Sequence, residues 1–141
     1  MTKILSIAGS DPSGGAGIQM DLKTFHALGS HGMAVPAALT AQNSRGVSST
    51  YPVPPRVIAR QIEALLSDIK PDAVKTGMLL TRQSVTVVAK AVRRYRIRNL
   101  VIDPVIRSSS GKPLLKPDAI ASIKKELFPL ARVITPNIPE A

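Results

Sequence analysis

Short apolar segments alternate along the chain with segments that have the spacing of amphipathic helices. The apolar segments lie at residues 3–8, 34–41, 72–75, 99–102 and 132–134, and the helical patterns at residues 18–29, 54–69, 84–94 and 117–127. Strands separated by helical patterns of about 10–15 residues are typical of βαβ units with right-handed crossovers. We therefore expect an α/β fold, a doubly wound and mostly parallel sheet, with residues 47–53 as a polar edge strand.

The composition predicts one globular domain. The chain has 141 residues, of which 44% are hydrophobic and 20% charged, ordinary values for a folded domain with a core. No apolar run approaches the roughly 20 residues of a membrane span, and the N-terminal apolar stretch is too short for a signal peptide. Cysteine is absent, which excludes disulfides and thiolate metal sites. We expect a cytoplasmic protein with no membrane partner.

The formal net charge of +10 would suit a nucleic acid or an anionic substrate. Ten of the nineteen Lys and Arg residues follow residue 90, and four of them, Arg93, Arg94, Arg96 and Arg98, cluster at the end of a predicted helix. Cations are favourable there because they face the negative end of the helix dipole. Tyr95 is the only aromatic residue beside them, too little for base stacking. We interpret the cluster as a solvated helix end and expect no nucleic-acid partner.

Small, polar or acidic residues follow five of the predicted strands. In a parallel sheet, ligands bind in the crevice beyond the carboxyl ends of the strands. Five such loops on one rim predict a binding site. The loops are residues 9–11, 42–43, 76–78, 103–105 and 135–137.

Some of these residues have a purely structural explanation as well. The glycine-rich loop 9–17 is neither a Walker loop nor a dinucleotide fingerprint, and it suits a tight turn as well as a ligand. Asp21, one turn into the next helix, is compatible with the helix dipole whether or not it binds anything. Asn137 and Glu140 form a capping-box pattern, which we favour over a role in organising Mg²⁺. Asp103 is the better metal candidate, because Mg²⁺ prefers oxygen ligands.

Taken together, residues 7–19 and 21–24 resemble the opening of the hydroxymethylpyrimidine/phosphomethylpyrimidine kinases. Further motifs of that family follow in the same order, and the last two are shared across the ribokinase and pyridoxal-kinase superfamily. They are residues 40–43 with 46–47, 75–79, 103–105, and 135–137 with 139–141. The resemblance implies that residues 1–141 are the N-terminal part of one three-layer, ribokinase-like kinase domain.

The resemblance also implies an activity. ATP would phosphorylate 4-amino-5-hydroxymethyl-2-methylpyrimidine and then its monophosphate, in thiamine diphosphate biosynthesis, with Mg²⁺ as the metal. By motif, the substrate positions would be Gly9, Asp21, Gln42, Met78 and Val105, the nucleotide and phosphate position Asn137, and the metal positions Asp103 and Glu140.

The sequence departs from the family pattern at two places. After residues 103–105 the family continues with an apolar residue and a short Ser-Gly or Lys-Ser-Gly loop. Here Arg107 adds a charge close to the predicted pocket, and we favour a solvated side chain over a phosphate contact. The family's chains continue well beyond Glu140 and bring the anion hole and the residue that activates the hydroxyl. We therefore expect no catalytic residue within residues 1–141.

A half-sheet would leave an unpaired edge and an uncovered apolar face, so we expect the chain alone to be unstable, oligomeric or inactive. A homodimer is one assembly that the sequence leaves open. The alternative functions are a pyridoxal or pyridoxine kinase and a non-catalytic pyrimidine-binding module.

Overall fold

Six strands form one sheet in the computed structural model, which describes residues 1–141. Their order across the sheet is β3-β2-β1-β4-β5-β6, and every neighbouring pair is parallel except β2 and β3. The predicted polar edge strand is therefore confirmed. The strands are β1 (Lys3–Ser10), β2 (His31–Asn43), β3 (Gly46–Pro52), β4 (Ala73–Thr76), β5 (Leu100–Ile102) and β6 (Val133–Ile134).

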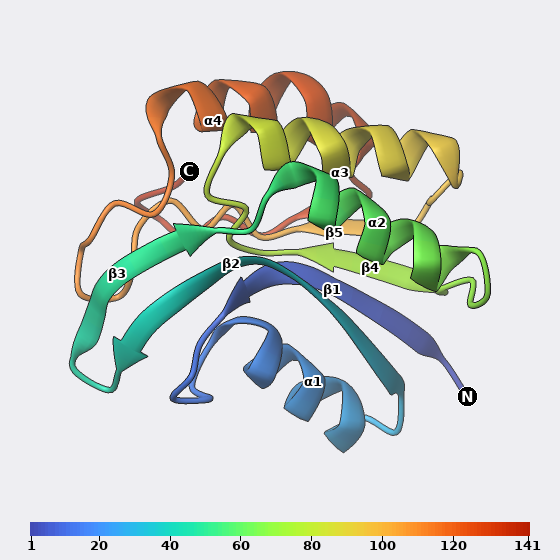
Figure 1. Ribbon diagram of the computed structural model, residues 1–141, viewed down its shortest axis with the longest axis horizontal. Coiled ribbons are helices and arrows are strands. Elements are labelled where there is room, and N and C mark those ends of the chain that lie inside the picture. Colours follow the sequence, from blue (N-terminus) through green and yellow to red (C-terminus); the bar gives the residue numbers. More distant parts are fainter.

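Helices cover both faces of this sheet (Figure 1). Helix α1 (Gly17–Ala27) lies on one face, and α2 (Pro55–Leu66), α3 (Arg82–Arg94) and α4 (Pro117–Ser122) lie on the other. The arrangement confirms the predicted α/β fold with helices on both faces. None of the helices is long and apolar enough to cross a membrane.

The main core lies between the sheet and the three-helix layer. Helices α2 and α3 each bury an apolar stripe in this core, and Leu5 and Ile7 of β1 belong to the same cluster. Because side chains alternate along a strand, Ser6 points to the opposite face, toward α1. It is fully buried there, and its hydroxyl donates a hydrogen bond to Asp21 of α1. A polar group in a buried central strand is thereby satisfied.

Several boundaries differ from the predicted ones. Strand β1 includes Gly9 and Ser10, which we assigned to a loop, because both pair with β2 after a register shift at Ala8. Strand β2 is longer at both ends, because residues 31–33 pair with the start of β1 and the antiparallel partner β3 extends the other end past β1, which leaves only residues 44–45 to turn. The helix predicted at residues 117–127 is α-helical only to Ser122 and continues as a π turn and a 3-10 turn. Pro129, which has no N–H to donate, lies in that last turn.

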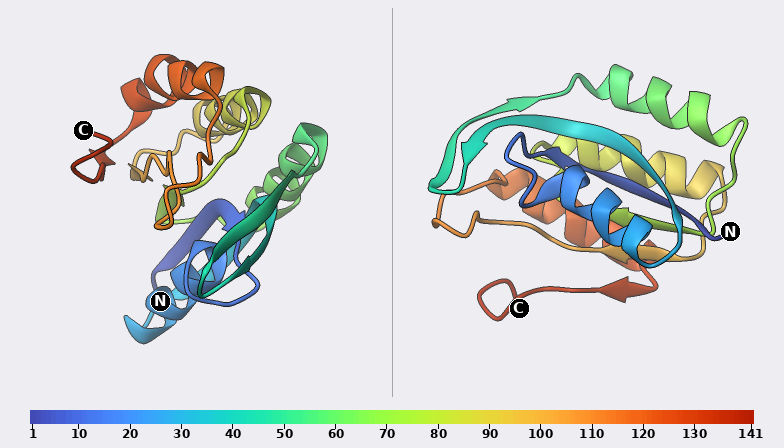
Figure 2. Two further views of the ribbon diagram at one scale, coloured as in Figure 1. Left: turned by 90° about the vertical axis from the view of Figure 1, so that its left-hand side faces the viewer. Right: turned by 90° about the horizontal axis from the view of Figure 1, so that it is seen from below.

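The arginine cluster at the end of α3 is solvated, as predicted. All four arginines are exposed, and Arg94 lies 3.4 Å from Glu63 and over the ring of Tyr95. The cluster borders the amino ends of the strands, whereas the loops with the predicted site residues follow the carboxyl ends. Strand β6 and the C-terminal turn lie at the edge of the sheet opposite β3 (Figure 2).

Candidate functional site

The candidate site lies where the chain leaves neighbouring strands toward opposite faces of the sheet. Strand β1 leads to α1 on one face and β4 leads to α3 on the other, so a crevice opens beyond their carboxyl ends. A cavity of about 340 Å³ occupies this position. Four of the five predicted loops contribute to its wall. Of the predicted site residues, Gly9, Asp21, Gln42, Met78, Asp103 and Val105 line it, whereas Asn137 and Glu140 do not.

The glycine-rich loop is organised by Asp11. This side chain is 2% exposed, and its carboxylate accepts four hydrogen bonds of 2.7–3.0 Å, from the backbone and hydroxyl of Ser13 and the backbones of Gly15 and Ala16. Burial by itself raises the pKa of Asp11, but these hydrogen bonds outweigh it and hold the pKa below its usual range. Asp11 lies in a predicted site loop but was not predicted as a site residue, although an Asp before Ser and Gly is a known turn signal.

Two glycines of this region allow close backbone approach. Gly17 has a φ of +60°, and a Cβ there would overlap the carbonyl oxygen of Gly9. A Cβ at Gly9 would overlap the Met78 side chain, so Gly9 and Met78 form one wall of the cavity together. Met78 is buried and packs in a small apolar cluster with Ala38 and Leu114. Met78 therefore makes this part of the wall apolar.

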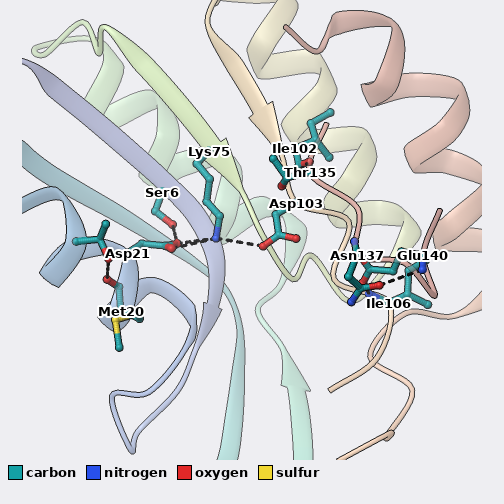
Figure 3. A network of polar contacts seen from close by, with 11 residues as sticks. Ser6, Met20, Asp21, Lys75, Ile102, Asp103, Ile106, Thr135, Asn137 and Glu140 are labelled. Carbon is teal, nitrogen blue, oxygen red and sulfur yellow. Dashed lines mark hydrogen bonds and ion pairs between the residues drawn. The ribbon is translucent and has the colours of Figure 1, made fainter. Parts of the chain in front are cut away.

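A lysine in β4 holds two of the three acidic residues of the cavity together (Figure 3). Lys75 Nζ lies 3.0 Å from both carboxylate oxygens of Asp21 and 3.9 Å from Asp103 Oδ2. Ser6 donates to the same Asp21 carboxylate at 2.6 Å, and Ser6 and Lys75 are direct partners in the β1–β4 pairing. The side chains of Lys75 and Asp21 are only 22% and 16% exposed. Lys75 belongs to the motif at residues 75–79, but it was not predicted as a site residue.

Gln42 presents an amide to the cavity from the end of β2. Its oxygen accepts a hydrogen bond of 3.1 Å from Thr40 Oγ1, which also lies 2.9 Å from the carbonyl oxygen of Ser10. The amide NH₂ group makes no hydrogen bond within the protein. The side chain is thus oriented through its oxygen and retains two donors for a ligand.

Asp103 follows the end of β5, and its carboxylate accepts no hydrogen bond from any group of the protein. Burial raises the pKa of this carboxyl. The Lys75 ammonium opposes that effect, and the carboxylates of Glu140 and Asp21 add to it, so the pKa lies above its usual value. Asp103 is therefore a carboxylate whose charge is incompletely compensated.

Asp103→Asn is expected to stabilise the protein slightly at pH 7. A pKa that is higher in the folded than in the unfolded state means that folding favours the protonated carboxyl, so this contribution is lost as pH rises through the folded pKa. The gain in the free energy of unfolding should stay below about 1 kcal/mol, because the Asp103 side chain is 37% exposed and its charge is screened by water. Urea unfolding in metal-free buffer at pH 7 and pH 4 measures it, with exposed Asp68→Asn as control. A variant less stable than wild type at pH 7 would contradict the expectation.

Asn137 and Glu140 form the capping box that the sequence pattern predicted. The Glu140 amide donates to Asn137 Oδ1 at 3.0 Å, and the Asn137 amide donates to Glu140 Oε2 at 3.1 Å. The other carboxylate oxygen, Oε1, accepts a hydrogen bond of 3.0 Å from the backbone of Ile106 in the loop after β5 (Figure 3). The turn is thereby attached to that loop beside the cavity. The roles of both residues toward Mg²⁺ and phosphate stay predictions.

A family model described as phosphomethylpyrimidine kinase matches residues 11–141. The chain belongs to this family. It is 51% identical over 137 residues to the hydroxymethylpyrimidine/phosphomethylpyrimidine kinase of Escherichia coli, an alignment that covers 97% of this chain and 52% of that relative. The chain spans about half the length of this relative.

Solved structures agree with the family and with the fold. The phosphomethylpyrimidine kinase of Clostridium difficile superposes with a TM-score of 0.93 at 49% identity, over 99% of this chain and 61% of that one. The pyridoxal kinase of Staphylococcus aureus in complex with AMP-PCP and pyridoxal has a TM-score of 0.86 at 38% identity, over 99% of this chain and 49% of that one. The ribokinase-like fold and the superfamily expected from the motifs are confirmed. Among these neighbours, the pyridoxal kinase is the more distant in sequence.

Proposed function

We propose that the protein phosphorylates 4-amino-5-hydroxymethyl-2-methylpyrimidine and then its monophosphate, using ATP, in cytoplasmic thiamine biosynthesis. The observation that supports this most is the cavity at the β1–β4 switch point, where Asp21 and Gln42 present an acceptor and a donor. An aminopyrimidine offers the matching set, since its amino group donates and its ring nitrogens accept. Membership in the phosphomethylpyrimidine kinase family supports the same substrate class.

The cavity residues would divide binding into polar recognition and apolar packing. Asp21 is held by Lys75 and Ser6, so its carboxylate would accept from the ring's amino group without searching other rotamers. Gln42 would donate to a ring nitrogen through its free NH₂ group. Met78 and Val105 would pack on the ring and the methyl group, and Gly9 leaves room for Met78 to do so. Prepositioned groups of this kind lower the entropic cost of binding.

Asp103 and Glu140 fit a hydrated Mg²⁺ in different ways. The Asp103 carboxylate has no hydrogen-bond donor, and its raised pKa indicates a charge that a cation would stabilise. Both oxygens of Glu140 accept backbone N–H groups, which suits contact through water better than direct coordination. When bound, Mg²⁺ neutralises charge on the transferred phosphate. Asn137, whose oxygen caps the turn, would keep its NH₂ group for the nucleotide phosphates.

Isothermal titration with hydroxymethylpyrimidine, followed by an ATP-turnover assay on the same sample, tests this function. We expect the wild type to bind and Asp21→Asn to bind at least about tenfold more weakly, because one charge-assisted hydrogen bond is lost. Asp68→Asn, an exposed charge on the α2–β4 connection, should bind like wild type.

The outcomes also separate the alternatives. Tighter binding of pyridoxal would favour the pyridoxal-kinase alternative, which the pyridoxal complex of the S. aureus neighbour makes worth testing. Turnover would exclude a pyrimidine-binding module, whereas binding with no turnover is compatible with both functions, because we expect no catalytic residue within residues 1–141. A folded protein that binds no pyrimidine would overturn the proposal.

A further inference from the structure

Arg107 lies on the wall of the cavity and has no acidic partner. It follows β5, and its side chain is exposed. The only contact of its guanidinium is a hydrogen bond of 3.2 Å from Nη1 to the carbonyl oxygen of Gly111. The protein's three ion pairs involve Lys75, twice, and Arg94, so no carboxylate lies within 4.0 Å of Arg107. Most of its five donor hydrogens are therefore free.

The backbone around Arg107 is fixed by bonds on both sides. Arg107 forms an isolated antiparallel bridge with Pro113, and the flanking Ile106 carbonyl accepts a hydrogen bond of 2.7 Å from Leu114. The Ile106 amide donates to Glu140 of the C-terminal turn. These contacts use backbone atoms of the loop and leave the arginine side chain out. The loop backbone thus presents Arg107 to the cavity, and the side chain itself contributes one hydrogen bond to the loop, at the Gly111 carbonyl.

The other charged groups of the cavity are already engaged or negative. Asp11 is saturated by the hydrogen bonds of its loop, and the Lys75 ammonium is bonded to Asp21. Asp103 is acidic and accepts no hydrogen bond. A phosphate monoester brings about 1.5 to 2 further negative charges at pH 7. Arg107 is the cation on the cavity wall with most of its donors available to it, and its neighbours Ser108 and Ser109 also line the cavity.

We propose that Arg107 binds the phosphate of a phosphorylated pyrimidine and so sets the preference for the monophosphate over the alcohol. The inference rests on the proposed function and adds a specificity residue to it. The sequence favoured a solvated Arg107. Its place on the cavity wall without an acidic partner favours the phosphate contact instead. A guanidinium suits this role because it binds phosphate through two parallel hydrogen bonds.

The test compares three ligands on wild type, Arg107→Gln and Arg107→Lys by isothermal titration. The ligands are hydroxymethylpyrimidine, its monophosphate, and ATP with Mg²⁺, since the phosphate could also be that of the nucleotide. We expect Arg107→Gln to bind the monophosphate at least about tenfold more weakly than wild type does, and to bind each of the other two ligands less than twofold more weakly. Arg107→Lys should lose less affinity for the monophosphate, because lysine keeps the positive charge and lacks only the bidentate geometry. Arg60→Gln, an exposed arginine of α2 outside the cavity, is the matched control.

Each outcome bears on one of the two proposals. Equal losses for the alcohol and the monophosphate, or a loss confined to ATP, overturn the role of Arg107 and leave the proposed function standing. An unchanged monophosphate affinity in Arg107→Gln does the same. A wild type that binds neither pyrimidine overturns the proposed function and this inference with it. Thermal unfolding of each variant checks that the loop and the fold are intact.

Discussion

Asp11→Ala should lower the free energy of unfolding by about 2–4 kcal/mol, in the range of mutations that break a buried hydrogen-bond network. The carboxylate is 2% exposed and accepts four hydrogen bonds. Hydrogen bonds to a charged group contribute more than neutral ones, and all four of these bonds are lost together in the variant. The loop 9–17 should lose its conformation at the same time. Urea unfolding at pH 7 measures the change.

The pH dependence of the free energy of unfolding separates the contribution of the Asp11 charge from that of its side-chain packing. Since the pKa of Asp11 is lower in the folded state, its stabilisation is present above the unfolded value near 3.9 and is lost as pH falls through the folded value. The difference between wild type and Asp11→Ala should therefore be constant between about pH 5 and 8 and shrink on further acidification. An equal difference at pH 3 and pH 7 would contradict this explanation. Exposed Asp68→Ala should change stability by less than about 0.5 kcal/mol at either pH.

The order of elements and the convergence of the loops were predictable because both follow from local periodicity. Each strand and helix shows its own spacing, and the rule for parallel sheets then places the strand ends on one rim. The capping box was predictable for the same reason, since Asn137 and Glu140 are three residues apart and bond to each other. Local patterns give no register, however, and the extension of β2 and the π turn after Ser122 were missed.

Contacts between distant residues could not be predicted from the chain alone. Lys75 meets Asp21 across 54 positions because Ser6 and Lys75 pair in register and α1 covers that face of the sheet. A lysine within a short apolar strand was the available signal, since a buried ammonium requires a partner. Arg107 shows the same limit, because its sequence neighbours do not indicate which side of the loop faces the cavity.

Lys75→Met should destabilise the protein and weaken pyrimidine binding at the same time. It removes the ammonium that lies 3.0 Å from both oxygens of Asp21 and leaves two partly buried carboxylates without a counter-charge. Removing one partner of a fully buried pair costs about 3–5 kcal/mol. The side chains of Lys75 and Asp21 are 22% and 16% exposed, so we expect the free energy of unfolding to fall by about 2–3 kcal/mol, as measured by urea unfolding. Binding of hydroxymethylpyrimidine should weaken at least tenfold, because Asp21 loses its orientation.

A double-mutant cycle with Asp21→Asn distinguishes the ion pair from simple packing. If the cost of Lys75→Met is the uncompensated charge of Asp21, the double variant should be less destabilised than the sum of the single variants by about 1–3 kcal/mol. Arg94→Met and Glu63→Gln form the matched cycle on the surface, where the side chains are 68% and 58% exposed, and should couple by less than about 1 kcal/mol. Additive effects at Lys75 and Asp21 would mean that the lysine stem only fills space. Lys75 would then have no part in orienting the carboxylate that we assign to the pyrimidine.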